Sequence, residues 1–325
     1  MARRHEMDYR YLTVPLVLIF FVANIAGHAE IAFFSYRKND SGIYLMDADG
    51  AHPVRLIGGG APSWSPDGSQ IAFYVGNGIG SDISVINLNG NNLRRLTEKR
   101  IDQNRFPAWS PDGTKIAFVS SRGGNLDIYV MTADGKNPKN LTWDLLEEDR
   151  PNWSPDGKKI AFGAFQLLPG GNRRESEVFV IDSNGDNRIN LTQNPRAINS
   201  YPSWSPDGKK IAYTASPKPG LWFAPFNIHV MDADGTNPVR LTAERRWASE
   251  WRPSWSADGG KIAFSSREPD GSEDIYSINS DGSALTNLTQ TPHVNDRSPA
   301  WRPAPFSVSA VGKLATQWGR VKQSR

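Results

Sequence analysis

The chain has 325 residues, no cysteine and a formal net charge of +3 at pH 7. The lack of cysteine excludes disulfide bonds and anchoring through a lipid-modified cysteine. The basic excess is small and spread along the chain, without a Lys/Arg run or a nucleic-acid motif, so the sequence predicts no nucleic-acid partner.

Residues 1–29 have the features of a secretory signal peptide. Arg3, Arg4 and Arg10 precede the apolar segment 12–26, and small residues follow at Gly27 and Ala29. Because the apolar segment is shorter than the ~20 residues of a spanning helix, we expect cleavage and export to the periplasm or the medium. An uncleaved membrane anchor is the alternative.

Residues 30–303 are predicted to form one domain built from tandem repeats. Tryptophan followed by Ser-Pro-Asp-Gly or Ser-Ala-Asp-Gly and an apolar run recurs along the chain, and a proline stands two residues before each tryptophan. The copies begin at Trp64, Trp109, Trp153, Trp204 and Trp255, and a truncated copy ends at Trp301. A period of roughly 45 residues is typical of four-stranded propeller blades.

Each repeat predicts four short strands. The first ends at the tryptophan, and Ser-Pro-Asp-Gly then forms a hairpin turn. The second and third strands are apolar runs such as 115–119 and 127–131. A turn ending in Asp-Gly or Asn-Gly leads to a fourth strand such as 238–242.

The two ends of the array are complementary. The first unit begins at Ile31 without a preceding tryptophan motif, whereas the last stops after Trp301. If the strand with Trp301 completes the sheet begun at Ile31, the ring closes without unpaired edges. The expected fold is therefore all-β, a six-bladed propeller of four-stranded antiparallel blades closed by the N- and C-terminal strands.

Over residues 31–303 the units resemble the TolB-type (WD40-like, PD40) propeller family, whose repeats read Pro-x-Trp-Ser-Pro-Asp-Gly-x-x-Ile-Ala-Phe and later Arg-Leu-Thr. The resemblance implies the propeller fold. Similar blades occur in periplasmic TolB, in peptidase propellers and in polysaccharide lyases, so the fold does not determine the function. The α/β domain that precedes the TolB propeller has no counterpart here, and neither does the Gly-x-Ser-x-Gly motif of the peptidases.

The two rims of such a propeller differ. The turn rim carries the repeated turns after strands one and three, and the connection rim carries the variable segments after strands two and four. Binding residues concentrate on variable loops held by a rigid scaffold. The segments entering the innermost strands are expected to form a channel-mouth binding site, with these residues: Arg105, Phe106, Asp149, Arg150, Tyr201, Glu250, Trp251, Arg252, Asp296 and Arg297.

This mixture of guanidinium, carboxylate and aromatic groups suits a peptide or a sugar, because arginine binds carboxylates through two parallel hydrogen bonds. The alternative is that the arginines only pair with neighbouring acids across blades. Trp222, Phe223 and Phe226 lie in a long loop of the same rim and form either a partner surface or a local core. The basic tail 304–325 has helical apolar spacing and could dock on the propeller, a partner or a membrane surface.

These features favour an exported, non-catalytic module that binds a protein or peptide, or a glycan. No cofactor motif is present, and the Asp-x-Asp-Gly turns lack the later ligands of a calcium loop, so no metal site is predicted. The alternative is a carbohydrate-active enzyme resembling a polysaccharide lyase, in which His229 or His293 would abstract a proton beside the channel-mouth arginines.

Overall fold

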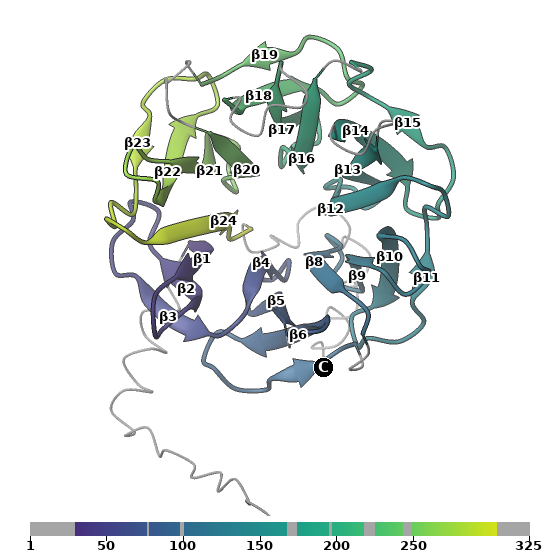
Figure 1. Cartoon of the computed structure of the whole chain (residues 1–325), viewed down its shortest axis with the longest axis horizontal. Coiled ribbons are helices and arrows are strands. Elements are labelled where there is room, and N and C mark those ends of the chain that lie inside the picture. Colours follow the sequence, from purple (N-terminus) through teal and green to yellow (C-terminus); the bar gives the residue numbers. More distant parts are fainter. Residues whose placement is uncertain are drawn as a thin grey trace, which may run out of the picture.

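A ring of small β-sheets surrounds a central axis in the computed structural model (Figure 1). The structure describes residues 30–76, 78–97, 101–167, 174–194, 197–217, 225–242 and 249–303. The predicted signal segment 1–29 and the predicted helical tail 304–325 lie outside the described residues. Within them, every regular element is a strand.

Five blades are continuous in sequence. From the axis outward, the first blade has β4 (Gly60–Trp64), β5 (Gln70–Gly76), β6 (Ser81–Asn87) and β7 (Arg94–Arg95), and the second has β8 (Asn104–Trp109), β9 (Lys115–Ser120), β10 (Asp127–Thr132) and β11 (Lys139–Asn140). The third blade has β12 (Glu147–Trp153), β13 (Lys159–Leu167), β14 (Arg174–Asp182) and β15 (Ile189–Asn190), and the fourth has β16 (Ile198–Trp204), β17 (Lys210–Ser216), β18 (Asn227–Asp232) and β19 (Val239–Arg240). The fifth blade has β20 (Glu250–Trp255), β21 (Lys261–Arg267), β22 (Glu273–Asn279) and β23 (Thr286–Asn287). Within each blade, neighbouring strands pair antiparallel.

The remaining blade joins both ends of the described chain. Its strands, from the axis outward, are β24 (Asn295–Trp301), β1 (Ile31–Tyr36), β2 (Gly42–Met46) and β3 (Val54–Ile57). β24 pairs antiparallel with β1, from Ile31 opposite Trp301 to Tyr36 opposite Asn295. The innermost strands contact one another in succession around the axis, including β24 with β4. The predicted all-β propeller fold is confirmed.

The repeated apolar residues pack one blade against the next. In the second strands, the phenylalanine of the Ile-Ala-Phe run is fully buried. Examples are Phe73, Phe118, Phe162 and Phe264. The tryptophans are buried or half-buried at the ends of the innermost strands. Trp64 also donates its indole N–H to the carbonyl of Ala300 at 2.9 Å, and Trp153 and Trp255 make the same bond to the preceding blade. The tryptophans therefore tie blades together.

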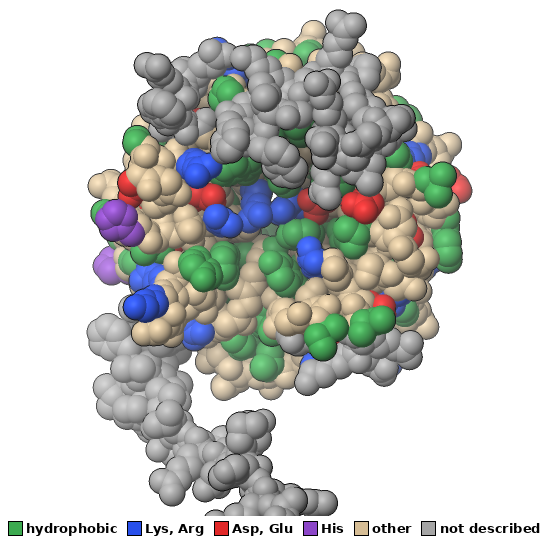
Figure 2. Space-filling view, in the orientation of Figure 1, with side chains coloured by type: hydrophobic (Ala, Val, Ile, Leu, Met, Phe, Trp, Pro, Cys, Tyr) green, Lys and Arg blue, Asp and Glu red, His purple; other side chains and the backbone are tan. Residues whose placement is uncertain are grey.

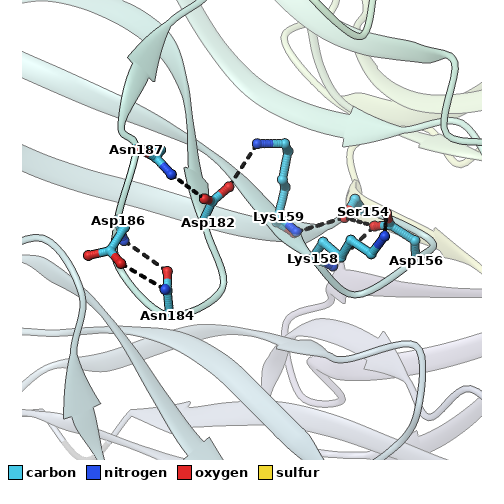
Figure 3. A network of polar contacts seen from close by, with 8 residues as sticks. All are labelled: Ser154, Asp156, Lys158, Lys159, Asp182, Asn184, Asp186 and Asn187. Atoms are coloured by element: carbon cyan, nitrogen blue, oxygen red, sulfur yellow. Dashed lines mark hydrogen bonds and ion pairs between the residues drawn. The ribbon is translucent and has the colours of Figure 1, made fainter.

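Polar bonds join the two repeated turns of a blade on the turn rim (Figure 3). Ser154 donates to Asp156 at 2.6 Å, and this bond, with the Lys158 amide, lowers the pKa of Asp156. Lys159, at the start of β13, reaches across to Asp182 at the end of β14 at 2.8 Å. Asn187 donates to the other oxygen of Asp182 at 2.7 Å. The motif residues of this rim are thus occupied in supporting its turns.

Candidate functional site

A cavity of about 690 Å³ runs along the propeller axis. That volume is within the ~300–1,000 Å³ usual for ligand pockets. Each innermost strand lines it with the residue before the repeated proline, the proline itself and the tryptophan, and the lining continues to the Ser-Pro turns. The cavity therefore extends from the middle of the innermost strands to the turn rim, and its other end is bounded by the six residues that precede the prolines.

These six residues form the channel ring: Ala61, Phe106, Arg150, Tyr201, Arg252 and Ser298. Each has a positive φ, between 48° and 61°, although none is glycine. The register of each innermost strand shifts at this point, as in the bulge between Asp149 and Asn152. Because a bulge redirects a side chain and interrupts the alternation of a strand, this one residue per blade turns toward the axis.

Arg150 is held in the ring by two aromatic side chains and one acid. Its guanidinium carbon lies 4.0 Å from the ring centre of Phe106 and 4.3 Å from that of Tyr201. Its Nε donates to the Asp149 carboxylate at 3.1 Å. Cation–π contacts and a charged hydrogen bond fix the orientation of this side chain.

Arg252 lacks such a partner. Its guanidinium donates to the hydroxyl of Ser298, and within the part of the chain that the structure describes no carboxylate lies at ion-pair distance from it. Burial, and then the nearby charge of Arg150, lower the pKa of Arg252 to about 10. The side chain remains a cation at neutral pH. Figure 2 shows basic side chains gathered at the central opening, with acidic side chains beside them.

The structure brings four of the predicted channel-mouth residues into the ring: Phe106, Arg150, Tyr201 and Arg252. The other six do not line the cavity: Arg105, Asp149, Glu250, Trp251, Asp296 and Arg297. These six lie outside the lining because the bulge turns only the residue directly before the proline inward. Sequence reasoning missed the small ring members Ala61 and Ser298, which the same proline alignment could have identified.

The acids three residues before the proline are part of the blade interior. Glu148, Glu250 and Asp296 are fully buried. Each accepts a hydrogen bond from a threonine hydroxyl, at 2.7 Å for Glu148 and 2.6 Å for Asp296. Burial raises the pKa of Glu148 to about 8 and also raises that of Asp296. These carboxyl groups anchor the connections that enter the innermost strands.

The arginines predicted at the mouth behave differently from one another. Arg297 forms an ion pair across blades with Glu273, and Arg105 donates to Gln103 two residues earlier. The pairing across blades therefore describes Arg297, whereas Arg150 pairs with Asp149 of its own strand β12. It does not describe Arg252.

Neither histidine of the lyase alternative lines the cavity. His229 packs against Tyr213 with ring centres 5.5 Å apart and the rings tilted by 42°. Burial, and then the charge of Arg240, lower the pKa of His229 to about 4. His293 is exposed and lies 3.5 Å from Asp270. Among the described residues, no group of three or more His, Cys, Asp or Glu side chains could hold a metal ion. The same residues contain no helix long and apolar enough to cross a membrane.

Four strongly exposed apolar side chains lie on connections of the connection rim. Of the large apolar side chains that the structure describes as exposed, those more than three-quarters exposed are Ile79, Ile101, Trp143 and Leu145. All four belong to connections after second or fourth strands of neighbouring blades, between β5 and β6, β7 and β8, and β11 and β12. We call them the apolar rim patch. The sequence analysis missed it, although each residue is an apolar interruption in a polar connection.

The predicted aromatic loop is only partly described. Trp222 and Phe223 lie outside the described residues. Phe226 is half-buried and packs against Trp251, with ring centres 6.3 Å apart. The role of Phe226 in a partner surface stays a prediction.

Comparison with known proteins identifies the family. The family model of the TolB beta propeller domain matches residues 25–167 and 150–311. The chain belongs to the TolB beta propeller domain family. A Tol-Pal system protein TolB of Anaeromyxobacter dehalogenans is 36% identical over 127 residues, which are 38% of this chain and 26% of that protein. The match thus spans about a quarter of the length of this TolB relative.

Solved structures show the same propeller fold. TolB from Acinetobacter baumannii has a TM-score of 0.70 at 24% identity, over 85% of this chain and 67% of that chain. An oligogalacturonate lyase in complex with manganese has a TM-score of 0.54 at 15% identity, over 80% of this chain and 73% of that one. Both the TolB protein and the lyase therefore show a shared fold and leave the function to the residues of the site.

Proposed function

We propose that this chain is an exported, non-catalytic interaction module whose partner is a protein or peptide that docks on the connection rim. The observation that carries the proposal is the apolar rim patch. Strongly exposed apolar side chains on variable connections favour an interaction surface, and tryptophan is among the residues that contribute most to binding energy. The channel ring bounds the cavity at the end away from the turn rim and contains two arginines, Arg150 and Arg252.

Family membership supports a protein partner, because the TolB relatives are named as proteins of the Tol-Pal system. Export is supported by the signal-peptide features of residues 1–29. Both statements are proposals for this chain. The lyase alternative assigned proton abstraction to His229 or His293, and neither of these residues lines the cavity.

Photo-crosslinking tests the proposal. A photoreactive amino acid replaces Leu145, and the matched control carries it at Val239, which is 57% exposed on the outer strand β19. We expect a discrete protein adduct from Leu145 in the exported fraction and none from Val239, because the partner contacts only the connection rim. Equal adducts at both positions, or none at Leu145, would contradict the proposal.

A further inference from the structure

The channel ring contains more positive than negative charge. Its two cations are Arg150 and Arg252, and the acid beside them is Asp149, which bonds to Arg150. Arg297, the next basic residue that influences Arg252, is already paired with Glu273. One guanidinium at the constriction is therefore left without a carboxylate among the described residues.

The geometry also leaves Arg252 able to bind. The Arg252 guanidinium donates one hydrogen bond to the hydroxyl of Ser298. A guanidinium has five N–H donors, so several remain for a ligand. Both arginines line the cavity, so a group inside the cavity can reach them. The Arg252 guanidinium is partly desolvated and lies near a like charge. Binding an anion therefore gains more free energy here than at an exposed arginine, because water screens the attraction less.

The aromatic members of the ring hold one of its two arginines. Phe106 and Tyr201 both contact the Arg150 guanidinium, so among the described ring residues these contacts hold Arg150 and not Arg252.

We infer that Arg252, supported by Arg150, is the receptor for a carboxylate on the partner segment that enters the channel. The carboxylate gives Arg252 a close ion pair of the kind that Asp149 forms with Arg150. This inference rests on the proposed function and specifies its partner as an acidic chain segment. Planar, two-point binding of carboxylates is what arginine does better than lysine.

The test uses the full chain and a rhodamine-labelled peptide of alternating glycine and glutamate, with the glutamine version as the uncharged probe. We expect fluorescence anisotropy to show at least about 10-fold tighter binding of the glutamate peptide. Arg252→Gln should weaken that binding about 10-fold or more, and Arg252→Lys should weaken it less. The lysine variant keeps the cation, so it remains informative if the glutamine variant does not fold.

Arg105→Gln is the matched control, since Arg105 lies one residue before a channel-ring residue but does not line the cavity. It should change binding by less than about 2-fold, because screening weakens distant charges. Equal binding of the two peptides, or equal losses from Arg105→Gln and Arg252→Gln, would overturn the inference. Displacement of the glutamate peptide by oligogalacturonate at lower concentration than by unlabelled peptide would overturn the assignment to a protein segment.

Failure of this inference is distinguishable from failure of the proposed function. If Arg252→Gln leaves the adduct yield at Leu145 unchanged, the partner docks without the carboxylate, and only the inference fails. If Leu145 gives no adduct in the otherwise unaltered chain, the proposed function fails whatever the peptide measurement shows.

Discussion

Replacing Trp64 by alanine should lower the free energy of unfolding by about 3–5 kcal/mol. Trp64 is buried against Ala32, Ile43 and Phe73, so the substitution leaves a cavity between the closing blade and the first continuous blade. It also removes the indole donor from the Ala300 carbonyl. Because native domains have only about 5–15 kcal/mol of stability, urea unfolding should show a large shift of the midpoint.

Two further variants separate the causes of that loss. Trp64→Phe keeps an aromatic ring but loses the hydrogen bond, and should cost about 1–3 kcal/mol. Trp143→Ala, at a side chain that is 77% exposed, should stay within about 0.5 kcal/mol of the unaltered protein. A Trp64→Ala protein within about 1 kcal/mol of the unaltered protein would show that the junction is not held as described.

Gly50→Ala should destabilise the protein much more than Gly90→Ala. Both glycines turn the chain between a third and a fourth strand, with φ of +89° and +79°. A side chain at either position costs about 1–2 kcal/mol in this left-handed conformation. At Gly50 the added Cβ would also stand 2.1 Å from the backbone oxygen of Leu288 in the adjacent blade, whereas at Gly90 nothing lies within 4 Å.

The steric overlap should add about 1–3 kcal/mol for Gly50→Ala, because backbone cannot move aside as a flexible side chain can. The two variants control for each other, since they share the turn and the substitution and differ in the neighbouring blade. Urea unfolding measures the difference. Equal losses in the two proteins would mean that the turn at Gly50 does not pack on the neighbouring blade.

The sequence was sufficient for the fold because its periodic residues are the ones that build it. The tryptophan, the Ser-Pro-Asp-Gly turn and the Asp-Gly turn mark strand ends in every unit, and the incomplete copy at Trp301 matched the missing strand beside Ile31. The fourth strands are shorter than expected, with only Val239–Arg240 paired in the segment predicted as 238–242.

The site was less predictable, because it depends on backbone conformations that the local sequence disfavours. Arg150 and Arg252 are neither glycine nor asparagine, and a residue before proline normally has an extended backbone. Nothing in either residue type indicates a positive φ, so the sequence analysis placed Asp149 and Glu250 at the mouth with the arginines, because all lie where the connections enter the innermost strands. Only the structure shows that Glu250 is buried beside Thr242 and that Arg252 turns into the channel.

Hydrogen exchange of the protein with and without its crosslinked partner tests the central claim most directly, since it reports contact along the whole backbone. If the partner docks on the connection rim, amide exchange should slow in the connections at 101–103 and 143–146 and stay unchanged in the Ser-Pro-Asp-Gly turns at 110–113 and 154–157. Protection confined to those turns, with unchanged exchange in both connections, would contradict the account.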